Sequence, residues 1–173
     1  LLENEFRMSQ DFYLGNPNLK KVGTEIQFTK EQIQEYLRCK EDPVYFAMNY
    51  IKIISLDEGI VPFKMWDFQQ ELIESFHENR FNIAKLPRQT GKSTTCVSYL
   101  LHYILFNDNV NVGILANKLS TARDLLGRLQ LAYEQLPLWL QQGIVVYNKG
   151  SMELENGSKI LAASTSASAV RGM

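Results

Sequence analysis

The sequence predicts an α/β fold in which a mainly parallel sheet is flanked by helices. The first observation is the segment from Phe81 to Thr95, FNIAKLPRQTGKSTT, which is typical of a short apolar strand, a tight loop and a helix start. The second is the apolar run from Val110 to Ala116, which follows that helix and suits a buried parallel strand. Together the two segments predict one βαβ unit.

Composition supports one globular domain with a substantial core. The chain has 173 residues, of which 45% are hydrophobic and 21% charged. No apolar run approaches transmembrane length and no signal segment follows Leu1, so we expect a cytoplasmic protein that has no membrane partner. Leu1 is not an initiator residue, and we expect the chain to be a fragment at its front. Cys39 and Cys96 lie far apart in the sequence, which favours neither a disulfide nor a zinc site.

Charge is distributed unevenly along the chain, whose formal net charge is −1. Residues 1–80 carry 9 Lys and Arg against 14 Asp and Glu, and residues 81–173 carry 9 against 5. Neither half is strongly basic. Proteins that contact many DNA phosphates usually present a clear basic face, so composition gives only weak support for nucleic-acid binding.

The loop after Leu86 has the residues that a phosphate-binding loop needs. Such a loop combines backbone N–H groups at a helix N-terminus with a glycine for close approach, a lysine for the phosphates and a hydroxyl for Mg²⁺. Leu86 stands where the usual pattern has its first glycine, and Arg88 adds a planar cation inside the loop. The alternative is a helix N-terminus without a ligand. The residues expected to contact phosphate are Arg88, Gln89, Thr90, Gly91, Lys92, Ser93 and Thr94, with Ser93 on the metal.

Residues 1–28 show no sustained period and predict an irregular N-terminal arm. In residues 29–80 we expect a mainly helical lead-in. A capping box, Thr29 to Gln32, predicts a helix that ends near Cys39, with Ile33, Tyr36 and Leu37 on one face. Asp42-Pro43 predicts a second helix, with Val44, Ala47, Met48 and Ile51 spaced for burial. Residues 51–55 and 60–63 predict a strand pair around Gly59.

The segment WDFQQ, residues 66–70, predicts the start of a helix that runs to about Asn79 and that Asp67 can cap. Its expected buried stripe is Phe68, Leu72, Ile73 and Phe76. A glutamine amide can pair with the N6 and N7 edge of adenine, and an aromatic ring gives the base a stacking surface. Gln69 or Gln70 is therefore a candidate adenine-binding residue beside Phe68, and a surface glutamine is the alternative.

Beyond the loop the pattern predicts a further helix, a strand and a hairpin. Asn117 or Ser120 is expected to cap the helix, whose apolar positions are Ala122, Leu125, Leu126, Leu129, Ala132 and Tyr133. Arg123 and Arg128 lie off that stripe, either on a solvated face or in contact with phosphates or a neighbouring subunit. Residues 144–147 predict a strand, and residues 152–162 predict a hairpin around Asn156-Gly157. Residues 164–172 are either an unstructured tail or a loop in which Arg171 acts as a sensor or finger.

Taken in order, these segments resemble the ATPase half of the large terminase subunit of T-even-type tailed phages. The resemblance covers nearly all of residues 28–173 and rests on EDPVYFAMNY, WDFQQ, LPRQTGKST, VGILA, ENGSKI and AVRG. It implies a P-loop NTPase fold of the ASCE or RecA-like type, with an ATPase core in residues 81–173. The family's loop also lacks the first glycine and carries an arginine, so Leu86 agrees with the match.

The resemblance implies that ATP and Mg²⁺ are the cofactors and that Arg88 and Lys92 are catalytic. Phe68 and Gln69 match the family's adenine motif, Lys92 and Ser93 its phosphate and Mg²⁺ residues, and Arg88 its stabiliser of the transition state. The implied function is ATP-driven packaging of double-stranded DNA into a procapsid in the host cytoplasm. The implied partners are the portal protein, the small terminase subunit and further copies of the chain in a ring.

In the family, an apolar strand ending in Asp-Glu follows the Val-Arg-Gly, so we expect the chain to be truncated before the Walker B strand, the catalytic glutamate and the nuclease domain. Such a fragment should bind ATP weakly, should not hydrolyse it, and should leave apolar strand edges open. Two other functions fit the sequence. One is a helicase or translocase of the superfamily 2 type, and the other is a non-catalytic ATP-binding assembly module.

Overall fold

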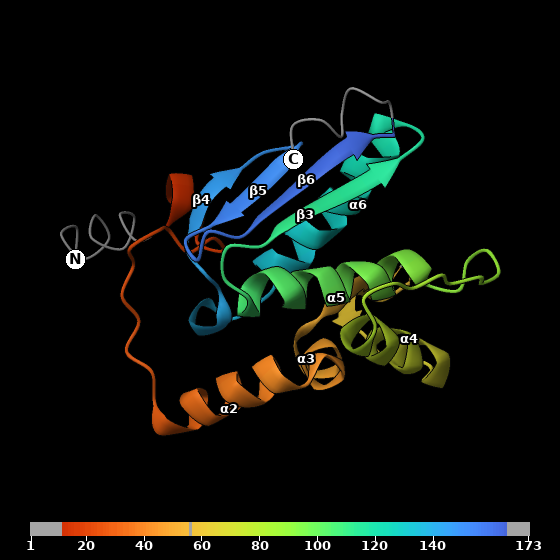
Figure 1. The fold of residues 1–173 in the computed structure, drawn as a ribbon. Helices are drawn as coiled ribbons and strands as arrows, with labels where there is room; N and C mark the ends of the chain where they lie inside the picture. Colours follow the sequence, from red (N-terminus) through yellow and green to blue (C-terminus); the bar gives the residue numbers. More distant parts are fainter. Residues whose placement is uncertain (1–11, 56, 166–173) are drawn as a thin grey trace.

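The structure is a computed structural model that describes residues 12–55 and 57–165 (Figure 1). The N-terminal part contains η1 (Tyr13–Gly15), α2 (Lys30–Glu41), α3 (Pro43–Tyr50), β1 (Lys52–Ser55), β2 (Gly59–Pro62) and α4 (Asp67–Glu78). The rest contains α5 (Lys92–Phe106), β3 (Asn111–Ala116), α6 (Leu119–Glu134), η2 (Leu138–Leu140), β4 (Ile144–Tyr147), β5 (Ser151–Leu154) and β6 (Lys159–Ser164). No helix among the described residues is long and apolar enough to span a membrane.

The expected α/β architecture is confirmed, but the sheet is mixed rather than mainly parallel. Its strand order is β3-β6-β5-β4, in which only β3 and β6 are parallel while β6, β5 and β4 form an antiparallel meander. In Figure 1, α6 lies behind this sheet, α5 runs below β3, and α2, α3 and α4 lie on the far side of α5. The strands β1 and β2 form a separate antiparallel ribbon, as the sequence predicted.

The strand predicted at residues 81–86 is wrong, because this segment is irregular and exposed. Phe81 has 83% and Ile83 101% of its surface accessible to solvent, and no described strand pairs with the segment. A strand needs a neighbour for its backbone hydrogen bonds, and alternation of apolar residues alone does not supply one. The predicted βαβ unit is therefore absent in that form, and the parallel partner of β3 is β6.

The predicted N-caps of α2 and α3 are confirmed, and in both helices a side chain accepts from a backbone N–H of the first turn. Thr29 and Gln32 form the reciprocal capping box of α2, and the Asp42 carboxylate accepts from the Tyr45 N–H at 2.8 Å to cap α3. The burial predicted for these helices is only partly right. Ile33 and Leu37 of α2 are about half exposed, as is Met48 of α3, because these short helices contact the core along a narrow strip. Ala47 of α3, by contrast, is fully buried as predicted.

Two predicted caps are wrong. Asp67 lies in the first turn of α4, whose N-cap is Trp66, and the Gln69 side chain accepts from the Trp66 N–H at 3.0 Å. The N-cap of α6 is Lys118, without a side-chain cap, so neither Asn117 nor Ser120 has that role. In α4 the buried residues are Gln69 and Ile73, and Phe68 of the predicted stripe is 36% exposed.

The hairpin between β5 and β6 also holds the C-terminal end of α5. Gly157 has φ +79°, as a tight turn requires, and the Asn156 amide donates to the carbonyls of Ile104 at 2.9 Å and Asn107 at 3.1 Å. The last carbonyls of a helix have no intrahelical donor, so this amide satisfies two acceptors that α5 itself cannot. The predicted hairpin thus fixes the position of α5 as well as of the sheet.

His102 is a buried polar group in the middle of α5. Its Nε2 lies 2.9 Å from the Cys39 carbonyl, its Nδ1 has no hydrogen-bond partner among the described residues, and the rings of Phe46 and Phe106 pack against it. Burial lowers the pKa of His102 to about 4, the Cys39 carbonyl opposes this shift, and nearby His77 adds to it. The imidazole is therefore neutral at pH 7 and donates from Nε2.

We predict that His102 makes stability depend on pH. Since its pKa is about 4 in the folded chain and 6.5 in the unfolded one, its contribution is complete above pH 6.5 and is lost as pH falls toward 4. The loss should be about 3 kcal/mol. Urea unfolding measures the free energy of unfolding at pH 7 and at pH 4.5. Its decrease between the two pH values should be smaller in His102→Gln than in the parent chain. His77→Gln removes only a smaller contribution to the pKa shift of His102, so it should reduce this decrease less than His102→Gln does. An equal decrease in all three proteins would contradict the assignment.

Candidate functional site

The turn from the loop into α5 has the backbone shape of an anion-binding site. Gly91 is the N-cap of α5 with φ +73°, and Gln89 also has a positive φ of 61°. This left-handed turn points the next N–H groups along the helix axis, where the first turn of any α-helix lacks backbone acceptors. The Thr95 hydroxyl and N–H both donate to the Gly91 carbonyl, at 3.2 and 3.0 Å, and hold the turn closed.

Lys92 lies across the loop instead of extending into solvent. Its ammonium donates to the Leu86 carbonyl at 3.1 Å and to the Pro87 carbonyl. The Thr90 hydroxyl donates to the same Pro87 carbonyl at 3.0 Å. The loop is thus wrapped around a cation whose partners are neutral carbonyls, which are weaker acceptors than phosphate oxygens.

Gln69 connects the start of α4 to this loop. Its Nε2 donates to the Thr90 carbonyl at 3.1 Å, and its Oε1 accepts from the Trp66 N–H at 3.0 Å. The side chain is 97% buried, since only 3% of the residue is exposed. A Cβ on Gly91 would lie 2.4 Å from this Nε2, so the glycine is required by close packing as well as by its φ.

A cavity of about 480 Å³ opens beside the loop. The loop contributes Gln89, Thr90 and Gly91 to its lining, and the start of α4 contributes Trp66, Phe68 and Gln69. Trp66 is 71% exposed, so its ring is available to a ligand. Among the described residues the lining includes the cation Lys64 and no carboxylate, which favours an anionic ligand with an aromatic portion.

The structure brings together most of the residues predicted for this site. Phe68, Gln69, Gln89, Thr90, Gly91 and Thr94 line the cavity. Lys92 lies in the loop beside it, and Arg88 and Ser93 are exposed there. Gln70 is half-buried and does not line the cavity, and Arg171 lies outside the described residues. Within residues 12–55 and 57–165 no group of three or more His, Cys, Asp and Glu could hold a metal ion.

Sequence reasoning missed Trp66 and the structural role of Gln69. Trp66 directly precedes the predicted helix, and an indole at that point is a recognisable signal for a stacking surface. Gln69 is the N3 residue of α4, where a glutamine commonly reaches back to the N-cap N–H. That pattern was visible in the sequence, whereas its second bond, to the loop, needed the folded chain.

The chain was also compared with models of known protein families, and no family model matches it. The interpretation of the site therefore rests on its own geometry and on the motifs in the sequence.

We predict that Gly91→Ala destabilises the chain by about 1–3 kcal/mol, because alanine is strained at φ +73° and its Cβ meets Gln69. Gln69→Ala is destabilising by itself because two hydrogen bonds are lost, but in that background Gly91→Ala should cost less than in the parent chain, since the contact is gone and the backbone strain remains. Gly127→Ala is the control, because that glycine lies inside α6 with open space around it and alanine favours the helix. Urea unfolding measures all of these variants, and a Gly91→Ala variant as stable as Gly127→Ala would contradict the packing described here.

Proposed function

We propose that the chain binds ATP with Mg²⁺ at the loop before α5. The observation that carries the proposal is the left-handed Gly91 at the start of α5, with the loop wrapped around Lys92 and a cavity beside it. Backbone N–H groups at a helix N-terminus, a lysine and a close-packed glycine are the parts that a polyphosphate needs. The cavity, with its exposed indole, lies next to them and accommodates a base.

Each part of the nucleotide has candidate partners. The phosphates would accept from the N–H groups of the first turn of α5, and Lys92 would exchange the Leu86 and Pro87 carbonyls for phosphate oxygens. Arg88 is an exposed cation in the same loop and would pair with phosphoryl oxygens. Mg²⁺ would bind the Ser93 hydroxyl, and when bound it neutralises charge on the phosphates.

The base would lie against Trp66 and Phe68, whose rings line the cavity. Gln69 already uses one amide hydrogen and one acceptor position within the protein, so a single N–H and a single lone pair remain for adenine. A glutamine held from two sides is a rigid reader, because its amide cannot rotate without breaking both bonds. This supports the proposed role of Gln69 in binding adenine. It also gives Gln69 a structural role, which is to join the start of α4 to the loop.

We further propose that the protein acts as the ATPase motor of a phage terminase large subunit, packaging double-stranded DNA in the host cytoplasm. The support is the collinear set of motifs from EDPVYFAMNY to AVRG. The portal protein, the small subunit and a ring of further copies are the partners in this proposal. A superfamily 2 type helicase or translocase shares the glutamine and the loop but not the whole set.

The chain itself is expected to bind the nucleotide without hydrolysing it. Hydrolysis needs a carboxylate that orients the attacking water, and within residues 12–55 and 57–165 no carboxylate lines the cavity. The alternative function that involves no catalysis is that of an ATP-binding assembly module. DNA-stimulated ATP hydrolysis by the intact protein would exclude this alternative.

We predict that Lys92→Ala weakens ATP binding roughly tenfold to hundredfold, because a charged hydrogen bond to phosphate is lost. Lys85→Ala is the matched control, since Lys85 is an exposed lysine of the same loop that does not line the cavity. Calorimetric titration with Mg-ATP should show the loss only in Lys92→Ala, with no phosphate released by the parent chain. Equal affinity in both variants would refute the phosphate site.

A further inference from the structure

A second cavity, of about 330 Å³, lies beside the first turns of α5. It is enclosed by residues 51–54 on the β1 side, by α5 and by α6. Its volume falls at the lower end of the roughly 300–1,000 Å³ typical of ligand sites. None of the functions considered above uses it.

The interior of this cavity is apolar. Ile51, Val97 and Ala132 form part of its wall and are at least 96% buried, and Leu131 adds a half-buried aliphatic side chain. The Ser98 hydroxyl also lies on the wall, but it donates to the Thr94 carbonyl at 2.8 Å and is therefore satisfied. A ligand would meet mainly aliphatic surface there, so an apolar body gains free energy by leaving water.

The charges at this cavity are of one sign. Lys52 and Arg128 line it and are exposed, and no aspartate or glutamate in the described part of the chain belongs to the lining. Neither cation forms an ion pair with another described residue. Two exposed cations above an aliphatic wall are complementary to a molecule with a negative head and an apolar body.

We propose that this cavity binds a small amphipathic anion, with its apolar body against Val97, Leu131 and Ala132 and its head group at Lys52 and Arg128. A monocarboxylate with an aliphatic chain has this chemistry. The site is distinct from the proposed nucleotide site and does not depend on it. The two cavities share Ile53 and Thr94 in their linings, so the test has to separate them.

Decanoate is a suitable probe below its micellar concentration, with two ten-carbon controls that differ in the head group. Calorimetric titration of the full chain should show saturable binding of decanoate, much weaker binding of neutral decanol and none of decyltrimethylammonium. Methyl NMR should shift Val97 and Leu131 on titration. Equal binding of the three probes, or shifts that spare both residues, would overturn the proposal.

Charge variants test where the head group binds. Arg128→Gln should weaken decanoate binding roughly tenfold and leave decanol unchanged, because only a charged hydrogen bond is lost. Arg123→Gln is the matched control, since Arg123 is an exposed arginine of α6 that does not line this cavity. All variants change exposed side chains, and circular dichroism checks that they fold.

Lys92→Ala separates the two sites. It should leave decanoate binding unchanged if the anion binds at Arg128, even if it abolishes ATP binding. Loss of decanoate binding in Lys92→Ala with retention in Arg128→Gln would place the anion in the loop and refute the second site. Equal weakening by Arg123→Gln and Arg128→Gln would refute it too, because the effect would then come from net charge.

Discussion

The structure depends on one constraint, which is that α5 must be buried along its length while its first turn stays open. Leu101 and Ile104 of α5 are fully buried, and Figure 1 shows α5 between the sheet with α6 and the helices α2 to α4. At the C-terminal end the Asn156 amide occupies the last carbonyls. At the N-terminal end Gly91 is a left-handed N-cap, and no side chain among the described residues caps the first N–H groups there. A helix anchored in this way presents a rigid donor set to a ligand.

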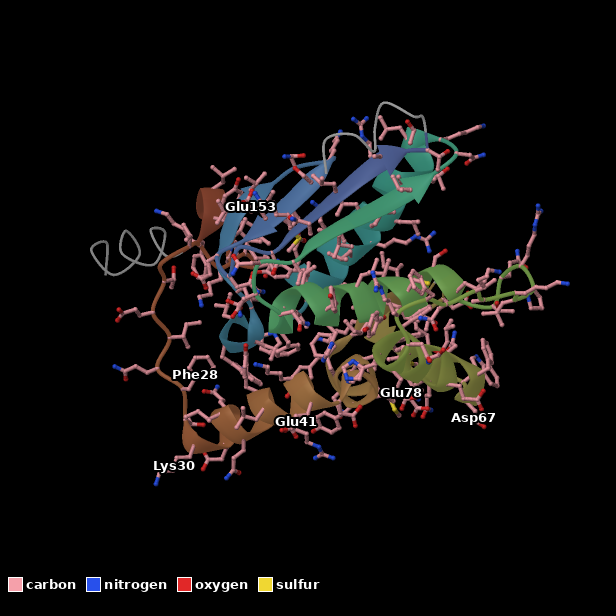
Figure 2. All side chains as sticks on the ribbon, viewed as in Figure 1. Phe28, Lys30, Glu41, Asp67, Glu78 and Glu153 are labelled. Carbon is pink, nitrogen blue, oxygen red and sulfur yellow. The ribbon has the colours of Figure 1, made fainter. Side chains whose placement is uncertain are left out.

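The site is assembled by one buried side chain rather than by the loop alone. Gln69 accepts from the Trp66 N–H and donates to the Thr90 carbonyl, so the aromatic wall of the cavity and the loop before α5 cannot move independently. Figure 2 shows how α4, between the labelled Asp67 and Glu78, lies beside the N-terminal half of α5. A ligand that contacts both the rings and the loop would therefore bind a preorganised site, which reduces the entropy lost on binding.

Two cavities flank the first turns of α5 and share Ile53 and Thr94. Their chemistry differs, because one is lined by aromatic rings and loop backbone and the other by aliphatic side chains below two cations. Thr94 also joins them through its carbonyl, which accepts from Ser98 at the second cavity. Both linings include Thr94, in the first turn of α5. Two ligands, one in each cavity, would therefore affect each other most directly at this turn.

The sequence by itself determined what depends on neighbours in the chain. The capping box at Thr29, the cap at Asp42, the period of α5 and the Asn156-Gly157 turn are local, and each is present in the structure. Only the tertiary structure decided the pairing of strands far apart in the sequence: β3 pairs with β6, whereas residues 81–86 have the alternation of a strand and no described partner. It also decided the burial of Gln69 and the joining of the two sides of the cavity. These features depend on contacts between residues about 20 or more positions apart, and such contacts form only where packing brings the backbone and its donors together.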